Sequence, residues 1–294
     1  MNTKHIFDIT ALQQQAKNDL KKAALFNKYG LHVQSQFPLP DHRNQNTSIV
    51  LYHSAHGKLF QNCSAAEKKL LAENIQLSYK SNLPAQGFWA HSLIEDGLLL
   101  VLPQGSDPYI VELEAQGDLA VAYVLIIARE NSVNSVVIQH RNNAPSHTII
   151  NVVCEPNSNL QLVLCEPQTY IPHYSQISST IGNQATFNCL QLARNINMLQ
   201  AYIATTAGEE THIEQNHLVF GSRDNKHDLY SEIKHLGAHS QSRLQSKIIL
   251  RDQAHTIYRG MSYIEPSATG CSSQQKEQTL LLNTGAKIDV VPML

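Results

Sequence analysis

From about residue 90 to its end, the chain carries short runs of apolar and β-branched residues, separated by polar clusters rich in Asn, Gly, Pro and Ser. The clusters recur at intervals of roughly 8–12 residues, which is typical of an all-β domain. The pattern predicts a series of short strands, at residues 98–102, 123–127, 136–138, 149–153, 160–164, 186–192, 199–203, 247–250, 256–258 and 279–282.

Sequence signals for tight hairpins are scarce in this region. Sandwiches and meanders often mark their hairpins with Asn-Gly or Asp-Gly, but the region has one such pair, Asp96-Gly97. The segment Val153-Cys154-Glu155-Pro156 is also echoed by Leu164-Cys165-Glu166-Pro167. Repeated short strands without hairpin turns favour a parallel β-helix, whose stacked turns bury a continuous apolar column. A β-sandwich stays open as the second interpretation.

The first part of the chain has a different pattern. Residues 10–29 follow a Thr cap with good helix formers and predict a helix. The sequence Ser64-Ala65-Ala66-Glu67 is a capping box that predicts a second helix, ending at about Tyr79. We therefore expect a partly helical N-terminal region over residues 1–85 and an all-β core over residues 86–294.

Composition narrows the classes of function. Hydrophobic residues make up 42% of the 294 residues, enough for a sizeable core, and the net charge is -2 without a Lys/Arg stripe that would suit nucleic acid. No apolar signal segment opens the chain, and the longest apolar runs, 98–102 and 121–128, are too short to span a membrane. Five cysteines without a CxxC pair indicate reduced thiols. These features predict a cytoplasmic protein with no nucleic-acid or membrane partner.

Motifs for phosphate binding, dinucleotide binding, nucleophilic catalysis and zinc proteolysis are absent from the sequence. The densest group of potential metal ligands is histidine-rich and has acidic neighbours: His212, His217, His227, His235, His239, Glu209, Glu210, Glu214 and Asp228. Imidazole and carboxylate together suit zinc, iron or copper, so a stand-alone metal-binding protein is one alternative. The other interpretation is a set of polar surface residues. As candidate metal ligands we take His227, His235 and Cys271.

Cysteine and aspartate pairs offer two further hypotheses. Cys154 and Cys165 occupy matching points of the echoed segments, so stacked turns could place them side by side as half of a zinc or iron–sulfur site, or as two small buried hydrophobes. Cys271 lies in a predicted turn, with Lys276 as the closest cation in sequence. Asp224 and Asp228 could serve a β-solenoid polysaccharide lyase or hydrolase, but solvated turn residues explain them better.

The last part of the chain carries the most specific pattern. It consists of His227-Asp228, residues 242–247, residues 258–264, Ala268, Gln275, residues 280–282, Ala286 and Pro292. Together with Asp96-Gly97-Leu98, Pro103 and Gly105 upstream, these residues resemble the SufB/SufD family of iron–sulfur cluster assembly proteins, over about residues 85–294. The sequence is more similar to SufD, because a cluster-building cysteine of SufB falls at or near Glu277, and SufD also lacks that cysteine.

The resemblance implies a right-handed parallel β-helix that pairs with a SufB-like subunit in a complex with the ATPase SufC. The complex assembles iron–sulfur clusters and passes them to apo-proteins, so the implied role is a non-catalytic scaffold subunit. No cofactor is then bound by this chain alone, and the cluster is present transiently in the complex. Where the SufB-like partner is missing, we expect a homodimer.

One departure from the family lies at the C-terminus. Family members continue past the position of Pro292 with more strand, a Cys-x-His-Gly-type segment and a helical domain that holds SufC. This sequence stops at Met293-Leu294, so the resemblance is to a C-terminally shortened member and direct binding of SufC is doubtful. The family's histidine for cluster building cannot be assigned to a residue here.

Overall fold

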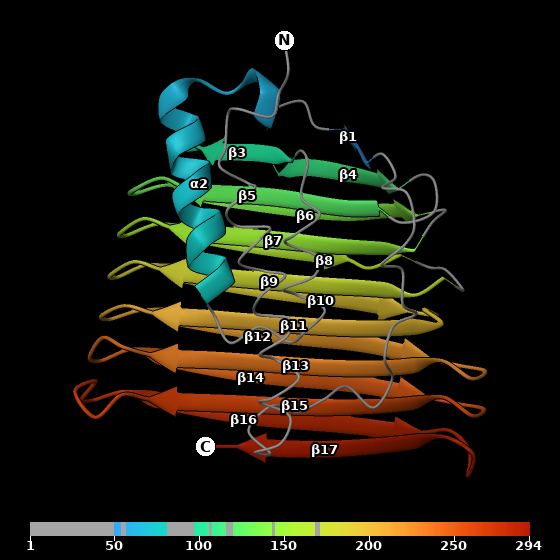
Figure 1. Ribbon diagram of the computed structural model, residues 1–294. Coiled ribbons are helices and arrows are strands. Elements are labelled where there is room, and N and C mark those ends of the chain that lie inside the picture. Colours follow the sequence, from blue (N-terminus) through green and yellow to red (C-terminus); the bar gives the residue numbers. More distant parts are fainter. Residues whose placement is uncertain are drawn as a thin grey trace.

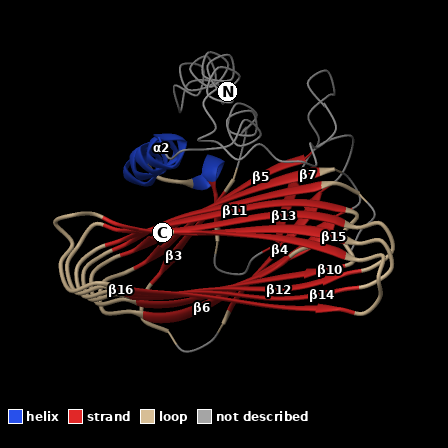
Figure 2. Ribbon diagram, turned by 90° about the horizontal axis from the view of Figure 1, so that it is seen from below, coloured by secondary structure: helices blue, strands red, loops and turns tan. Residues whose placement is uncertain are grey.

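Parallel strands that alternate between two sheets make up most of the structure. The computed structural model describes residues 50–53, 57–80, 97–105, 108–115, 120–142, 145–167 and 171–294. After each strand of one sheet the chain turns a corner and enters the other sheet, so that successive turns stack as a β-solenoid of about six turns. Figure 1 shows the stack from the side, and Figure 2 shows the two sheets as two layers seen along it.

The first sheet contains the even-numbered strands from β4 onward, with β1 at its edge. In spatial order its strands are β1 (Val50–His53), β4 (Tyr109–Ala115), β6 (Val133–Asn142), β8 (Asn159–Cys165), β10 (Thr186–Arg194), β12 (His212–Gly221), β14 (Gln241–Leu250) and β16 (Ser272–Leu281).

The second sheet contains the odd-numbered strands from β3 onward, with β2 at its edge. In spatial order its strands are β17 (Lys287–Met293), β15 (His255–Ile264), β13 (Lys226–His235), β11 (Met198–Ala207), β9 (His173–Ile181), β7 (Ser146–Cys154), β5 (Ala120–Ala128), β3 (Leu98–Leu102) and β2 (Lys58–Leu59). Among the described strands, only the pairs β1–β4 and β2–β3 are antiparallel.

In-register pairing stacks inward-facing side chains into ladders. One ladder of the second sheet runs through Val124, Ile150, Ile177 and Ile203, and all four are buried. Residues that hydrogen-bond across one turn are 26 apart in sequence at Ser179 and Thr205. At Ser242 and Ser273 they are 31 apart, so the turns lengthen toward the C-terminus.

From β5 onward, the six corners that lead from the second sheet into the first share one backbone geometry. Each places a residue in the left-handed region, with φ between 53° and 71°, at Asn131, Asn157, Gln184, Glu210, His239 and Gly270. The next residue is small every time, because the corners stack closely: Ser132, Ser158, Ala185, Thr211, Ser240 and Cys271. Backbone hydrogen bonds join neighbouring corners, as from Gln184 N to Glu209 O at 2.8 Å.

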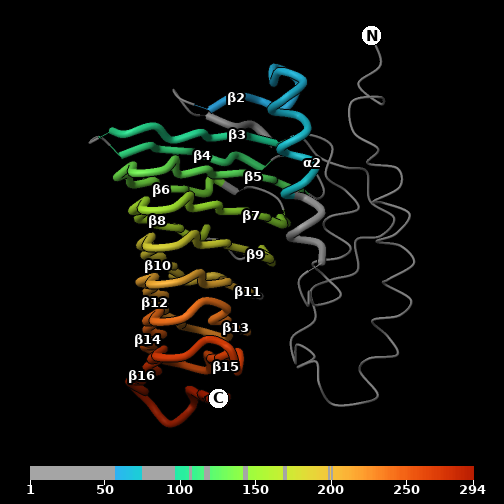
Figure 3. The backbone as a smooth tube through the Cα atoms, turned by 90° about the vertical axis from the view of Figure 1, so that its left-hand side faces the viewer, coloured from blue at the N-terminus to red at the C-terminus, as the bar shows by residue number. Residues whose placement is uncertain are grey.

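Helix α2 (Ala65–Lys80) lies against the outer face of the second sheet over the first turns (Figure 3). The predicted capping box is confirmed, since Ser64 N donates to Glu67 Oε2 at 2.7 Å and Glu67 N donates to Ser64 Oγ at 3.3 Å. Leu71 packs with Tyr123 and Leu125 of β5 in one apolar cluster. The helix predicted at residues 10–29 falls outside the described residues. None of the helices that the structure describes is long and apolar enough to cross a membrane.

The predicted parallel β-helix is confirmed and the sandwich interpretation is wrong. All ten predicted runs lie in strands, apart from the last residue of the final run. The strands β1, β2, β4, β9, β12, β13 and β17 were not predicted. β1 and β2 fall in the region expected to be partly helical, and the other five alternate apolar with polar residues or carry polar residues on both faces.

Replacing Leu162 of β8 by Ala should lower the free energy of unfolding by about 2–5 kcal/mol, because the deletion leaves a cavity inside the solenoid. The Leu162 side chain is 0% exposed and stacks between Val136 and Cys189. Urea unfolding followed by circular dichroism measures the change. Leu218→Ala is the control, since Leu218 is 44% exposed and its truncation should cost less than about 0.5 kcal/mol. Equal losses in both variants would contradict this account of the core.

Candidate functional site

A row of polar side chains runs through the interior of the solenoid. In the first sheet, Ile138 and Leu164 occupy an inner position that is taken in the following turns by Gln191, His217 and Ser246. All five side chains are buried. Apolar clusters lie on both sides of this row, one around Phe187 and Ile213 and the other around Val219 and Leu229. The polar row therefore divides the core of the later turns.

Hydrogen bonds connect this row from strand to strand. Gln191 Nε2 donates to Glu166 Oε1 in a short contact, and Gln191 Oε1 lies 2.8 Å from His217 Nδ1. Because an amide oxygen only accepts, His217 carries its proton on Nδ1. His217 Nε2 then accepts a short hydrogen bond from the Ser231 hydroxyl in the second sheet. The buried imidazole is thus fully satisfied, as a polar group inside a protein must be.

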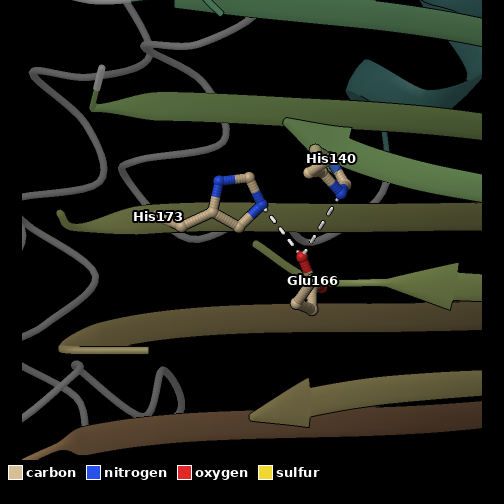
Figure 4. Close-up of side chains that lie close together, drawn as sticks. All are labelled: His140, Glu166 and His173. Carbon is tan, nitrogen blue, oxygen red and sulfur yellow. Dashed lines mark ion pairs between the residues drawn. The ribbon is translucent and has the colours of Figure 1, made fainter. Parts of the chain in front are cut away.

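At one end of the row, His140, Glu166 and His173 converge on a common point (Figure 4). His140 lies in β6, Glu166 directly follows β8, and His173 opens β9. His173 Nε2 is 3.0 Å from Glu166 Oε2, and His140 Nδ1 is 4.0 Å from the same oxygen. The three side chains are 1%, 0% and 0% exposed for His140, Glu166 and His173. The cluster therefore joins the first sheet, through His140, to the second sheet, through His173.

Electrostatics in the cluster favour a negative carboxylate beside a neutral ring. Burial alone would raise the pKa of Glu166, but the nearby His173 and His140 rings and the Gln191 amide outweigh it and hold that pKa below its usual value. Burial, together with the neighbouring His173, lowers the pKa of His140 to about 4. His140 is therefore neutral at pH 7, with Nδ1 donating to the Cys165 carbonyl at 3.0 Å and Nε2 facing the Thr148 hydroxyl at 2.8 Å.

Two imidazoles and one carboxylate form a donor set that binds divalent transition metals. Among the described residues, this cluster is the only group of three or more His, Cys, Asp or Glu side chains placed to share a metal ion. His140 and Glu166 lie one solenoid turn apart, whereas Glu166 and His173 lie on either side of the corner between β8 and β9. No local sequence motif signals the cluster, and the residues were not predicted as a site.

The structure places the predicted metal ligands His227 and His235 inside the solenoid. Both rings are 0% exposed, which corrects the interpretation of these histidines as surface residues. His227 bonds to Thr256 Oγ1 at 3.0 Å and to the Ile196 carbonyl at 3.3 Å. His235 contacts the hydroxyls of Ser240 at 2.5 Å and Ser242 at 2.8 Å. Their nitrogens are occupied by protein partners, and the two rings are not brought together.

Of the other histidine-rich positions, His212 and His239 are exposed, while His217 belongs to the polar row. Cys271 is the small residue of the last corner, with Sγ 3.2 Å from the Gly237 carbonyl and 3.1 Å from Ser240 Oγ. Its position therefore follows from corner packing.

Cys154 and Cys165 do not meet. Cys154 ends β7 and stacks between Ala128 and Ile181 in the second sheet, whereas Cys165 lies in β8 of the first sheet. The echoed segments are therefore two strands of one turn, and not stacked turns. Burial raises the pKa of Cys154 to about 12, so this thiol is protonated at neutral pH.

Asp224 and Asp228, the carboxylates proposed for a polysaccharide-cleaving site, have different environments. Asp224 is exposed in the corner before β13, whereas Asp228 is buried and paired with Arg259 in a short contact. A polar depression beside the first turns, lined by Gln104, Gly105, Val133, Asn134, Ser135, Asn159 and Gln161, contains no acid or base. Neither place supports hydrolysis or elimination chemistry.

Comparison with known families gives a match for most of the solenoid. The family model described as "SUF system FeS cluster assembly, SufBD core domain" matches residues 111–294, from within β4 to the last residue. Among curated proteins, no match was found. The matched segment includes His140, Glu166 and His173.

Buried neutral histidines should make the protein sensitive to acid. Burial lowers the pKa of His217 and of His227 to about 4, whereas the unfolded chain titrates near 6.5. The unfolded state therefore binds more protons between these values, and stability is lost as the pH falls through this window. The free energy of unfolding should decline by up to about 1.4 kcal/mol per pH unit for each such histidine.

Urea unfolding at several pH values measures this slope. His227→Gln should remove the contribution of one histidine, up to about 1.4 kcal/mol per pH unit, from the slope of the unfolding free energy against pH. Gln retains polar groups but does not titrate. His212→Gln, which changes an exposed ring, should leave the slope unaltered. A wild-type stability that stays flat between pH 6.5 and pH 4 would show that these rings are not held neutral.

Proposed function

This chain belongs to the SufB/SufD family of SUF iron–sulfur cluster assembly proteins, and we propose that it acts there as a non-catalytic scaffold subunit. The observation that carries the proposal is the family match over residues 111–294, which spans nearly all turns of the solenoid. Support also comes from the described residues, where the only cluster with metal-ligating chemistry is enclosed in the core. A surface active site for a polymer substrate is not supported, so the hydrolase or lyase alternative is set aside.

Within the family, we propose a SufD-like role and pairing with a SufB-like β-helix. Glu277, which stands at or near the position of the cluster-building cysteine of SufB, occupies an inner position of β16 next to Ser246 of β14. A carboxylate at this position supports the SufD-like assignment, because thiolates are the usual cluster ligands.

The last turn offers a surface for this pairing. Apolar side chains that are 39–54% exposed gather on β16, the corner after it and β17: Leu280, Leu281, Leu282, Val290 and Val291. Among the described strands, β16 and β17 are also the outermost of their sheets at this end, so their backbone edges have no neighbouring strand. Exposed strand edges and apolar patches favour association with another chain. The occupant we propose is a SufB-like solenoid, replaced by a second copy of this chain where that subunit is missing.

Replacing Leu280 by Arg should weaken co-purification with the SufB-like subunit of the same organism by about tenfold or more, since a charge in a buried contact costs over 1.4 kcal/mol. Tagged pull-down and sedimentation of the mixture measure the loss. Leu218→Arg is the matched control, because Leu218 is an exposed leucine of β12, away from the last turn. Undiminished pairing of Leu280→Arg, or equal loss in both variants, would refute this surface.

The isolated chain should not hold a stable iron–sulfur cluster. Clusters need about four ligands, chiefly thiolates, but burial raises the pKa of Cys154 and of Cys189 to about 12. Cys63 is buried near α2, and Cys165 and Cys271 lie in different turns. Anaerobic reconstitution with iron and sulfide, then desalting and absorption spectroscopy, tests this. A stoichiometric charge-transfer band that persists in wild type and disappears in Cys165→Ala would overturn the expectation.

A further inference from the structure

We propose that the solenoid binds one divalent transition-metal ion of the Fe²⁺ and Zn²⁺ class through His140, Glu166 and His173. This site is separate from the cluster that the family assembles, because it has no thiolate among its ligands. It also does not depend on the proposed pairing with a SufB-like subunit, since all three ligands come from this chain.

The spacing of the ligand atoms suits a single ion. Ligands about 2.0–2.1 Å from a metal at near-tetrahedral angles are roughly 3.4 Å apart. The observed separations to Glu166 Oε2 are 3.0 Å from His173 Nε2 and 4.0 Å from His140 Nδ1. The second separation exceeds the tetrahedral value by about 0.6 Å, so a modest movement of the His140 ring would let Nδ1 and Glu166 Oε2 contact the same ion. One ligand atom from each of the three residues lies within 4.8 Å of the other two.

Two of these atoms are buried polar groups without a hydrogen bond. Neither Glu166 Oε2 nor His173 Nε2 has a hydrogen-bond partner, although they face each other at 3.0 Å. Their contact at 3.0 Å therefore lacks the geometry of a hydrogen bond. An ion on the axis of the ring nitrogen could contact both atoms and satisfy them. Buried polar groups without partners are rare and call for such an explanation.

The remaining polar atom of each ligand is held by a neighbour. Ser146 Oγ lies 2.7 Å from His173 Nδ1, and Thr148 Oγ1 lies 2.8 Å from His140 Nε2. Gln191 Nε2 donates to Glu166 Oε1. Outer partners of this kind fix the orientation of metal ligands in known sites. The cluster differs from His227 and His235, whose ring nitrogens all bond to the protein, because His173 Nε2 has no hydrogen bond.

Binding requires one rearrangement of a proton in the His140 ring. In the structure Nδ1 donates its proton to the Cys165 carbonyl at 3.0 Å. When the proton resides on Nε2 instead, it is donated to the Thr148 hydroxyl oxygen, and the Nδ1 lone pair becomes free for the metal. The ring stays neutral throughout, so the tautomer change itself adds no charge to the core, and the Cys165 carbonyl gives up its hydrogen bond from Nδ1. Three protein ligands leave further coordination positions open, as in the two-histidine, one-carboxylate sites of iron enzymes.

The test uses the full chain, stripped of metal with a chelator and titrated with Co²⁺. Elemental analysis after desalting counts the bound metal, and the visible absorption of Co²⁺ reports its coordination. We expect one ion per chain and a rise in melting temperature on binding. Glu166→Gln keeps the shape of the side chain but removes a charged ligand, so it should weaken binding at least about tenfold. His227→Gln, a buried histidine outside the cluster, is the matched control and should bind as wild type does.

Each outcome decides the proposal. Substoichiometric binding by wild type, or equal binding by wild type and Glu166→Gln, would overturn it. If circular dichroism shows that Glu166→Gln does not fold, His140→Gln replaces it and is judged by the same criteria. A pairing defect in Leu280→Arg leaves this result unaffected, so the two proposals fail separately.

Discussion

In-register stacking of one turn on the next is the constraint on which the whole molecule depends. Each inward-facing residue lies directly against the residue one turn before it and one turn after it, so its environment is set by partners about 26 to 31 residues away. From β5 onward the corners keep this register, because a left-handed residue followed by a small one recurs at the same point of each turn. A single turn in isolation would bury little apolar surface, and stacking against the neighbouring turns stabilises that turn.

The polar row follows from the same constraint. Once His217 occupies an inner position, the neighbours above, below and opposite must offer hydrogen bonds, and Gln191 and Ser231 do so. A half-satisfied polar network inside a core is costly. The row extends to Glu166, where an unbonded carboxylate oxygen meets an unbonded imidazole nitrogen. The buried polar atoms of Gln191 and His217 thus have hydrogen-bond partners, whereas two atoms at the end of the row do not. The proposed metal ion would contact these two atoms.

Strands with continuous apolar runs, such as β3 and β5, were predictable from the sequence, because burial on two faces makes both their inner and their outer residues apolar. Prediction from the sequence failed at β12 and β13, where inward-facing histidines and serines made buried strands look like a polar surface. The histidine group between residues 212 and 239 is close in sequence but divided between the two sheets. The His140 cluster is distant in sequence and close in space, and only the solenoid register assembles it.

The last turn connects the polar interior to the proposed partner surface. Gln275 Nε2 lies 3.0 Å from Ser262 Oγ and 2.9 Å from the Met293 carbonyl, so interior hydrogen bonds reach β17 itself. Gln275 and Glu277 are half-buried, because no further turn covers them in the described chain. A solenoid stacked on β16 and β17 would exclude water from both side chains. Hydrogen bonds strengthen where water is excluded, so the proposed pairing would strengthen the interior hydrogen bonds of the last turn. The same surface would also give the edges of β16 and β17 a neighbouring strand.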